Sequence, residues 1–306
     1  MSFTESAYEN AIIELLRDKL GYSYLYGPDV ARDFHNPLLE PVLFESIAAV
    51  NKGRHPDAVG EAIRKLKNIE SGSLLQKNAV FTDYLQNGIE AGYFENGVQK
   101  YTRVNLVDYE TPENNTFYVV NQWTVIENET KRPDVVLFVN GLPVVLVELK
   151  SCAREKTDVS EAYKQIRNYM KEIPSMFIYN AVCVISDLSA SRAGTITADE
   201  ERFMEWKTVN GDYEETQFAM FNVLFEGMFE KSRILDILKN FIVFSAETPT
   251  AAKILAGYHQ YFAVKKAIVS TERAAKTDGK GGVFWHTQGS GKSLSMVFYS
   301  KQIQEV

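Results

Sequence analysis

The chain contains the stretch Arg132-Pro133-Asp134-Val135-Val136 and, after thirteen residues counted from Asp134, the stretch Glu148-Leu149-Lys150. Two apolar runs rich in β-branched residues lie between them and flank Asn140-Gly141, a dipeptide typical of tight hairpin turns. The pattern therefore predicts two antiparallel strands. An acid at the start of one strand, with a Glu and a Lys two residues apart on the next, can surround a single point at a sheet edge.

The register of this hairpin decides whether such a site can form. If the loop held only its two central residues in regular pairing, Glu148 would lie opposite Pro133, and Asp134 would point to the other face of the sheet. We therefore expect either an odd-length loop that reaches Leu142 or a β-bulge nearby. Either device places Asp134 opposite Glu148, and Lys150 shares the face of Glu148 because the side-chain period of a strand is two.

These three side chains are suited to phosphodiester chemistry. Asp134 and Glu148 offer the carboxylate oxygens that Mg²⁺ prefers, and a bound Mg²⁺ holds phosphate and lowers the pKa of an attacking water. Lys150 would orient or deprotonate that water and stabilise charge on the scissile phosphate. The residues predict a metal-dependent nuclease with Asp134 and Glu148 as metal ligands. The alternative is that a buried strand ends in solvated charges and that Pro133-Asp134 is only a strand-initiating turn.

A helix is predicted downstream, because the apolar residues of 158–169 recur at helical spacing. Gln165 and Tyr169 are one turn apart and face together. Between residues 150 and 171 there are six basic residues and three acids, in a chain with a net charge of -7. This local positive surface could hold phosphates, although an ordinary solvated helix face with charge pairs is the alternative.

A second motif lies near the end of the chain. Gly282-Val283-Phe284-Trp285 predicts a short strand, and helical spacing begins at Leu294, so the glycine-containing loop between them has the context of a phosphate-binding loop. In this interpretation Lys292 reaches the β- and γ-phosphates of ATP and the Ser293 hydroxyl completes a Mg²⁺ shell. The loop amides would hold the phosphate, and they belong to Gly289, Ser290, Gly291, Lys292 and Ser293. The alternative is a glycine turn that merely opens a helix.

Together these motifs resemble the restriction (R, HsdR) subunit of type I restriction enzymes. The resemblance covers nearly the whole chain, and its motifs lie at residues 8–16, 121–123, 132–150, 192–197, 201–204, 240–244, 258–264 and 285–293. It implies an α/β fold with a PD-(D/E)xK nuclease-like mixed sheet flanked by helices. The beginning of a RecA-like helicase lobe would follow. His286 stands where the phosphate-loop pattern has its first Gly, a change that the family tolerates.

The resemblance also assigns roles to single residues. Gln165 and Tyr169 would position the DNA backbone beside the catalytic residues, and Gln260 would read adenine. Alternatively, Gln260 is one polar residue on an amphipathic helix. A Glu on the first helix lies near the metal in the family, and Glu9 falls on that position. The spacing of Ser6 and Glu9 also fits a capping box, in which Glu9 would bond back to the Ser6 amide.

The implied activity is that of a large machine. The intact subunit would hydrolyse ATP to pull double-stranded DNA past itself and would cut both strands when bound to modification (methyltransferase) and specificity subunits. This chain stops soon after its phosphate loop, so we expect that it cannot translocate DNA. We also expect that the apolar faces of its last sixty or so residues are left uncovered, which makes stable folding of this part doubtful. Two other functions stay open: a nucleotide-binding P-loop enzyme and a non-catalytic docking module with the nuclease fold.

Composition and patterning set the remaining expectations. The chain has 45% hydrophobic and 24% charged residues, with no membrane-length apolar run, which indicates a cytoplasmic globular protein whose Cys152 and Cys183 are reduced thiols. We predict an endonuclease domain at 1–245 and a partial motor domain at 246–306. Further predictions are helices at 6–20, 38–50, 56–69, 74–86, 216–229 and 232–240, an antiparallel pair 98–109 with 117–126, a strand at 177–186, and a polar connection at 189–212 that acts as a lid or docking loop.

Overall fold

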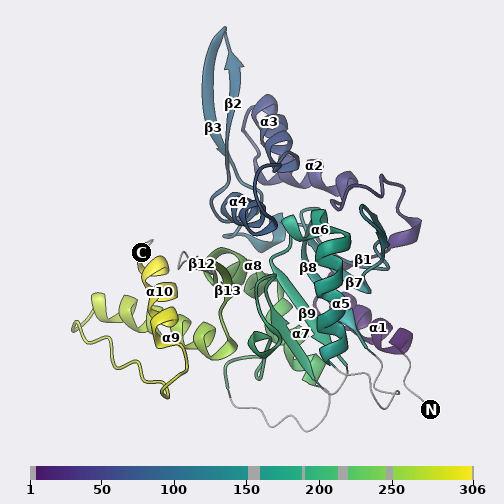
Figure 1. The fold of residues 1–306 in the computed structure, drawn as a ribbon. Coiled ribbons are helices and arrows are strands. Elements are labelled where there is room, and N and C mark those ends of the chain that lie inside the picture. The colour runs from purple at the N-terminus through teal and green to yellow at the C-terminus, as the bar shows by residue number, and fades with distance from the viewer. Residues whose placement is uncertain (1–4, 151–158, 188–189, 213–219, 246–250, 305–306) are drawn as a thin grey trace.

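A mixed sheet lies at the centre of the computed structural model, which describes residues 5–150, 159–187, 190–212, 220–245 and 251–304 (Figure 1). Its strand order is β1-β4-β7-β8-β9-β10-β11. The bounds are β1 Ser23–Tyr26, β4 Phe117–Asn121, β7 Val135–Val139, β8 Leu142–Leu149, β9 Val182–Ser186, β10 Ser191–Gly194 and β11 Met204–Glu205. The predicted α/β class with a mixed sheet is therefore confirmed.

The predicted hairpin forms the middle of the sheet. β7 and β8 pair antiparallel, with Val139 opposite Leu142, so the loop holds only Asn140 and Gly141. Both loop residues have positive φ, 50° and 80°, as the tight turn that matches strand twist requires. A Cβ on Gly141 would lie 2.8 Å from the backbone of Leu43, so only glycine fits here. The odd-length loop expected from the sequence is wrong.

A β-bulge sets the register instead. The pairing shifts between Leu137 and Phe138, and beyond that point Val135 lies opposite Val147. Continuing this register by one residue places Asp134 opposite Glu148. The second device expected from the sequence is confirmed.

Helices cover both faces of the sheet, and alternate residues of β7 therefore pack in two separate cores. Val135 and Leu137 pack in one core with side chains of α1, α7 and α8, whereas Val136 and Phe138 pack in the other with α5 and α6. The helices on the two faces are α1 Glu5–Glu14, α5 Val159–Glu172, α6 Pro174–Ile178, α7 Met220–Phe229 and α8 Lys231–Asn240. α1 continues into a π-helical turn at Leu15–Lys19. Three further helices, α2 Glu40–Val50, α3 Pro56–Lys67 and α4 Leu74–Asn87, match the predicted ranges.

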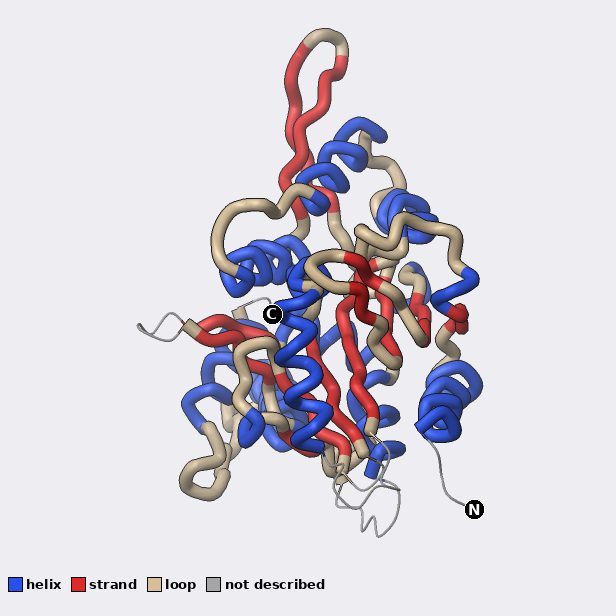
Figure 2. The backbone as a smooth tube through the Cα atoms, turned by 45° about the vertical axis from the view of Figure 1, so that its right-hand side comes forward, coloured by secondary structure: helices blue, strands red, loops and turns tan. Residues whose placement is uncertain are grey.

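A two-stranded ribbon projects from the body at the top of Figures 1 and 2. It consists of β2 Ile89–Glu95 and β3 Val98–Val104. The predicted pairing of 98–109 with 117–126 is therefore wrong. β4 pairs with β1 and β7 instead. Four of its five residues are buried, as expected of a central strand rather than half of an exposed hairpin.

Other predicted elements differ or are only partly described. The predicted strand at 177–186 begins only at Val182, because Pro174–Ile178 forms a helix. The polar connection 189–212 contains β10, the edge strand β11 and a 3-10 turn at Glu200–Arg202. The first residues of the helix predicted at 216–229, and Cys152, lie outside the described residues.

Two further expectations concern thiols and membranes. Cys183 is a buried free thiol, as expected, and burial raises its pKa to about 12. No helix of the described ranges is long and apolar enough to cross a bilayer.

The C-terminal part begins with a small hairpin of β12 Ile242–Ser245 and β13 Ala252–Leu255, followed by α9 Tyr258–Ala275 and α10 Lys292–Ile303. The domain boundary predicted at 245 falls between these two paired strands and stays a prediction. The strand expected at 282–285 does not form: Val283 and Trp285 are 93% and 77% exposed. No strand in the described part of the chain pairs with this segment, so an extended conformation would give its backbone no inter-strand hydrogen bonds.

Replacing Gly141 with Ala tests the turn. We expect Gly141→Ala to lower the free energy of unfolding by about 2–4 kcal/mol, because the new Cβ meets backbone atoms at a positive φ. Gly97→Ala is the matched control: its φ is +78°, but nothing lies within 4 Å of the added carbon, so the cost should be about 1 kcal/mol. Urea unfolding of both variants measures the difference, and equal losses would contradict the packing argument.

Candidate functional site

The three charged residues predicted from the sequence meet at one end of the central hairpin. The Lys150 Nζ lies 2.6 Å from Oε1 of Glu148 and donates to the Leu149 carbonyl at 3.0 Å. Asp134 Oδ2 accepts a hydrogen bond from the Leu149 amide at 2.8 Å. The structure therefore brings Asp134, Glu148 and Lys150 together around the end of β8.

Burial makes this cluster electrostatically unusual. Glu148 is 2% exposed, and burial raises its pKa although the Lys150 ammonium opposes the shift. Burial and then repulsion from Glu148 raise the pKa of Asp134 to about 8. Burial opposes the charge of Lys150, but attraction to Glu148 outweighs it and raises the pKa of the ammonium. Two carboxylates with one ammonium leave the cluster short of positive charge.

One oxygen of the cluster is left without a partner. Glu148 Oε2 is buried and has no hydrogen-bond partner of normal geometry among the described residues, whereas Oε1 is held by Lys150. The Tyr169 hydroxyl lies beside this carboxylate and opposes the rise of its pKa. A buried carboxylate oxygen without a donor is costly. A bound cation would satisfy both this oxygen and the missing positive charge. No group of three or more His, Cys, Asp or Glu side chains suited to a metal occurs in the described ranges, so carboxylate ligation here would rest on Asp134 and Glu148.

Tyr169 lies beside the same carboxylate, and Gln165 lies beside Tyr169. α5 packs against β8 and β9, and it buries Tyr169 to 5% exposure. Burial and then the charge of Glu148 raise the pKa of the Tyr169 hydroxyl, while the Gln165 amide opposes the shift. Tyr169 therefore faces the acidic cluster, and Gln165 contacts its hydroxyl. Lys164 and Lys171 lie on the exposed side of the same helix.

Glu9 does not cap its helix. α1 already includes Ser6, so the capping box expected from the spacing is wrong. The Glu9 carboxylate instead accepts hydrogen bonds from the Asn121 amide at 2.5 Å and the Gln122 side-chain amide at 2.8 Å. The backbone N–H of Gln122 in turn donates to the Asp134 carbonyl at 3.0 Å. Glu9 therefore fixes the end of β4 next to Asp134.

The rest of α1 contributes contacts that the sequence interpretation missed. The Tyr8 hydroxyl lies 2.5 Å from Ser186 Oγ at the end of β9, and the Ser186 carbonyl accepts from the Lys150 amide at 2.9 Å. α1 is thus tied to β4 by Glu9 and to β9 by Tyr8, and it crosses the ends of β7 and β8, which lie between them. Glu5 is on the same stripe, and its charge raises the pKa of Asp134. The i, i+3, i+4 spacing of 5, 8 and 9 was the available signal.

The phosphate-loop residues adopt a helix-opening turn. Lys292 is the first residue of α10, after Gly291 with φ 76°, and its ammonium donates to the carbonyls of His286 at 3.0 Å and Thr287 at 3.1 Å. The Gln260 amide donates to the Gly291 carbonyl at 3.1 Å and accepts from the Gly257 amide at 2.9 Å. Gln260, although distant in sequence, is thus in contact with the phosphate loop. The exposed Ser293 lies in the first turn of α10.

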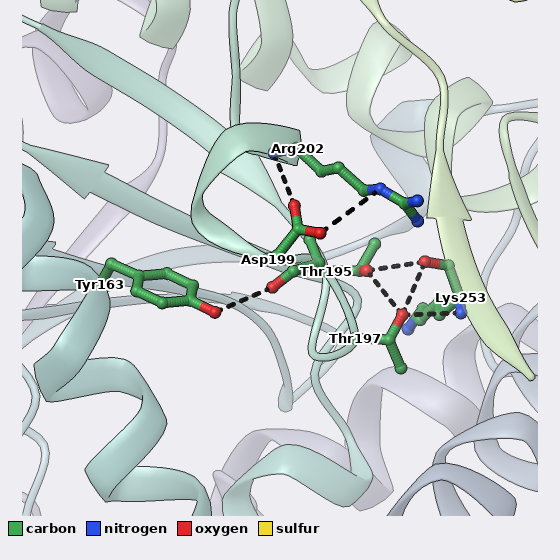
Figure 3. A network of polar contacts seen from close by, with 7 residues as sticks. Tyr163, Thr195, Thr197, Asp199, Arg202 and Lys253 are labelled. Atoms are coloured by element: carbon green, nitrogen blue, oxygen red, sulfur yellow. Dashed lines mark hydrogen bonds and ion pairs between the residues drawn. The ribbon is translucent and has the colours of Figure 1, made fainter. Parts of the chain in front are cut away.

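A cavity of about 470 Å³ separates this loop from the 195–202 segment. Gly289, Ser290 and Gly291 line one side, and Thr195, Thr197 and Arg202 line the other. Figure 3 shows how the second wall is held: the Thr195 and Thr197 hydroxyls donate to the Lys253 carbonyl at 2.7 and 3.0 Å. The connection predicted as a lid or docking loop is therefore packed against β13 and faces the phosphate loop.

Comparison with known proteins identifies the family. Residues 2–202 match the family described as type I restriction enzyme R protein N terminus, and residues 259–306 match SWI2/SNF2 ATPase. The chain is 35% identical, over 96% of its length, to the type I restriction enzyme HindI endonuclease subunit of Haemophilus influenzae. It is 29% identical, over 96% of its length, to the putative MjaIXP endonuclease subunit of Methanocaldococcus jannaschii. It spans 30% and 31% of the length of these two relatives. The chain therefore belongs to the family of type I restriction enzyme R proteins, in the part that includes their N terminus.

Proposed function

We propose that this chain is the Mg²⁺-dependent endonuclease module of an ATP-dependent, DNA-translocating type I restriction enzyme, and that its substrate is the phosphodiester backbone of double-stranded DNA. In this proposal the sheet is a PD-(D/E)xK nuclease fold, and α9 with α10 begins a helicase-like lobe. The observation that carries the proposal is the convergence of Asp134, Glu148 and Lys150 on one strand end. Names of the relatives, which are called endonuclease subunits, support it.

The donor set suits a hard divalent cation. Asp134 and Glu148 would hold Mg²⁺, because their oxygens are the ligands it prefers and because one Glu148 oxygen is buried without a donor among the described residues. The raised pKa of Asp134 reflects, after burial, the repulsion that a cation would relieve. When bound, Mg²⁺ supplies Lewis acidity toward phosphate and lowers the pKa of a coordinated water.

The protein side chains would perform the other tasks. Lys150, held by Glu148 at 2.6 Å, keeps an ammonium at the strand end where it can donate to the attacking water and to a phosphate oxygen. Tyr169 and Gln165 supply a hydroxyl and an amide beside Glu148, and they would position the sugar-phosphate backbone. The exposed Lys164 and Lys171 on the same helix would contact neighbouring phosphates.

Nucleotide binding would use the second motif. The loop Gly289 to Ser293 opens α10 with its amides at a helix N-terminus, where an anion is favoured. Lys292 donates to two loop carbonyls, and it would exchange them for the β- and γ-phosphates of ATP, with Ser293 on the accompanying Mg²⁺. Gln260 would turn toward adenine. Modification and specificity subunits would complete the enzyme and choose the DNA site.

Cleavage by the assembled enzyme tests the catalytic assignment. In a plasmid-cutting assay with ATP and Mg²⁺, Asp134→Ala and Lys150→Ala should each reduce cleavage at least about 100-fold while ATPase activity stays intact. Lys52→Ala, which removes one exposed charge from the turn after α2, should retain most of the activity. Unchanged cutting by Asp134→Ala would leave the docking-module alternative as the better account.

Metal binding can be tested without activity. The folded pKa of Asp134 is about 8 against an ordinary 3.8, so this group destabilises the metal-free fold progressively as pH rises from about 4 to 8. Asp134→Asn keeps an acceptor for the Leu149 amide and removes the repulsion. It should therefore raise the free energy of unfolding at pH 8 by about 1–3 kcal/mol, with no gain at pH 4.

Thermal unfolding with a chelator and with added Mg²⁺ measures both effects. Wild type should gain stability from Mg²⁺ at pH 8, and Asp134→Asn should not. A wild-type chain indifferent to Mg²⁺, or a variant that responds as strongly, would count against the proposed ligands.

ATP binding has its own test. Lys292→Ala should weaken binding of a fluorescent ATP analogue to this chain at least about tenfold, because the ammonium would contact two phosphates of the nucleotide. Lys52→Ala, which removes an exposed cation from the turn after α2, is the control and should bind normally. Equal affinity of the Lys292 variant and wild type would exclude the phosphate-loop assignment.

A further inference from the structure

One exposed face of α9 and the turn that follows it carries a row of cations. Lys266, Arg273 and Lys276 are spaced i, i+7 and i+10, and all three are exposed. Lys280 follows in the exposed turn. Residues 265–280 contain five basic residues and two acids, Glu272 and Asp278, in a chain whose net charge is -7. We call Lys266, Arg273, Lys276 and Lys280 the α9 basic stripe.

The charges of this stripe are not used within the fold. The neighbouring Lys265 forms an ion pair with Asp236 at 3.0 Å. By contrast, none of the four stripe residues forms an ion pair with any residue that the structure describes, whereas lysines on other elements do. The stripe is therefore a concentration of uncompensated positive charge on an otherwise acidic chain.

A hollow lies along the stripe. It has a volume of about 450 Å³, and its polar lining comes from Lys265, Lys266, Arg273, Ser270 and Asn210. Phe262 and Val269 supply the apolar part, with Val269 65% exposed. Ammonium, guanidinium, hydroxyl and amide donors around one depression are the groups that contact phosphate and sugar in protein–DNA complexes.

We propose that the α9 basic stripe binds the phosphate backbone of double-stranded DNA, at a surface separate from the nuclease site. The seven residues from Lys266 to Arg273 rise about 10.5 Å along a helix, which corresponds to about three base-pair steps of 3.4 Å. Successive cations can therefore follow one strand. In Figure 1 α9 lies at the lower left of the molecule and α1 at the lower right, so this contact is additional to the one at Asp134 and Glu148.

The cations of the stripe would attract any polyanion. The choice of duplex DNA as the phosphate polymer rests on the proposed function. On a chain of net charge -7, DNA contact requires such local patches, because the overall field is repulsive.

Duplex binding by this 306-residue chain tests the stripe. Fluorescence anisotropy with a labelled duplex of about 30 base pairs at several salt concentrations would compare wild type with the double variant Lys266→Gln/Arg273→Gln. We expect about tenfold weaker binding near 0.1 M salt, and a slope of log affinity against log salt that is smaller by about two. The matched control is Lys52→Gln/Lys100→Gln, which removes the same charge from the turn after α2 and from β3, and it should bind within about twofold of wild type.

The outcomes separate this inference from the proposed function. Equal affinities and slopes for wild type and the stripe variant, or equal losses in both double variants, would overturn the stripe as a DNA surface. So would a wild-type chain that binds phosphatidylserine vesicles but no duplex. If the enzyme assembled with Asp134→Ala still cuts while the stripe variant binds weakly, the nuclease assignment fails and the stripe stands.

Discussion

The β-bulge between Leu137 and Phe138 is the constraint on which the site depends. Regular pairing from the two-residue turn would place Asp134 and Glu148 on opposite faces, and no change of side chain could then bring them together. The turn cannot lengthen, because Gly141 is wedged against the backbone of α2 and Asn140 donates to the Leu106 carbonyl. The extra residue is therefore absorbed inside the strand, where burial of every residue of β7 and β8 holds the altered register.

The cluster that results is costly to the folded chain. Two carboxylates lie near each other with one ammonium beside them, and a buried oxygen of Glu148 has no donor among the described residues. The surrounding contacts keep these groups in place against their repulsion: the Leu149 amide holds Asp134, and Glu9 and Tyr8 attach α1 to the strands on either side. The fold maintains repulsion between two carboxylates that a cation would relieve. This repulsion distinguishes a candidate binding site from a solvated strand end.

The sequence predicted what local periodicity and stereochemistry determine. The hairpin, the need for a register device, and the helices of 40–87 and 159–172 all follow from side-chain spacing and turn residues. The partner of β3 was mispredicted although its signal is local: Asn96-Gly97 joins β2 to β3 with positive φ at both residues, as Asn140-Gly141 joins β7 to β8. Glu9 was misjudged because a capping box and a tertiary contact have the same spacing. The strand expected at 282–285 failed because a strand needs a neighbour as well as a pattern.

The carboxylate cluster and the loop Gly289 to Ser293 are connected more directly than their separation in sequence suggests. α5, which presents Tyr169 to Glu148, is attached to the 195–198 segment by Tyr163, which donates to the Ala198 carbonyl, and by Arg167, which donates to the Ile196 carbonyl at 2.9 Å. That segment is anchored to Lys253 and forms a wall of the cavity that faces Gly289 to Gly291. A continuous set of packed and hydrogen-bonded groups thus joins the carboxylate site to the phosphate loop. Because Lys253 is 3% exposed and donates to Asn78 and to the Asn180 carbonyl, this junction is part of the core rather than a loose contact between modules.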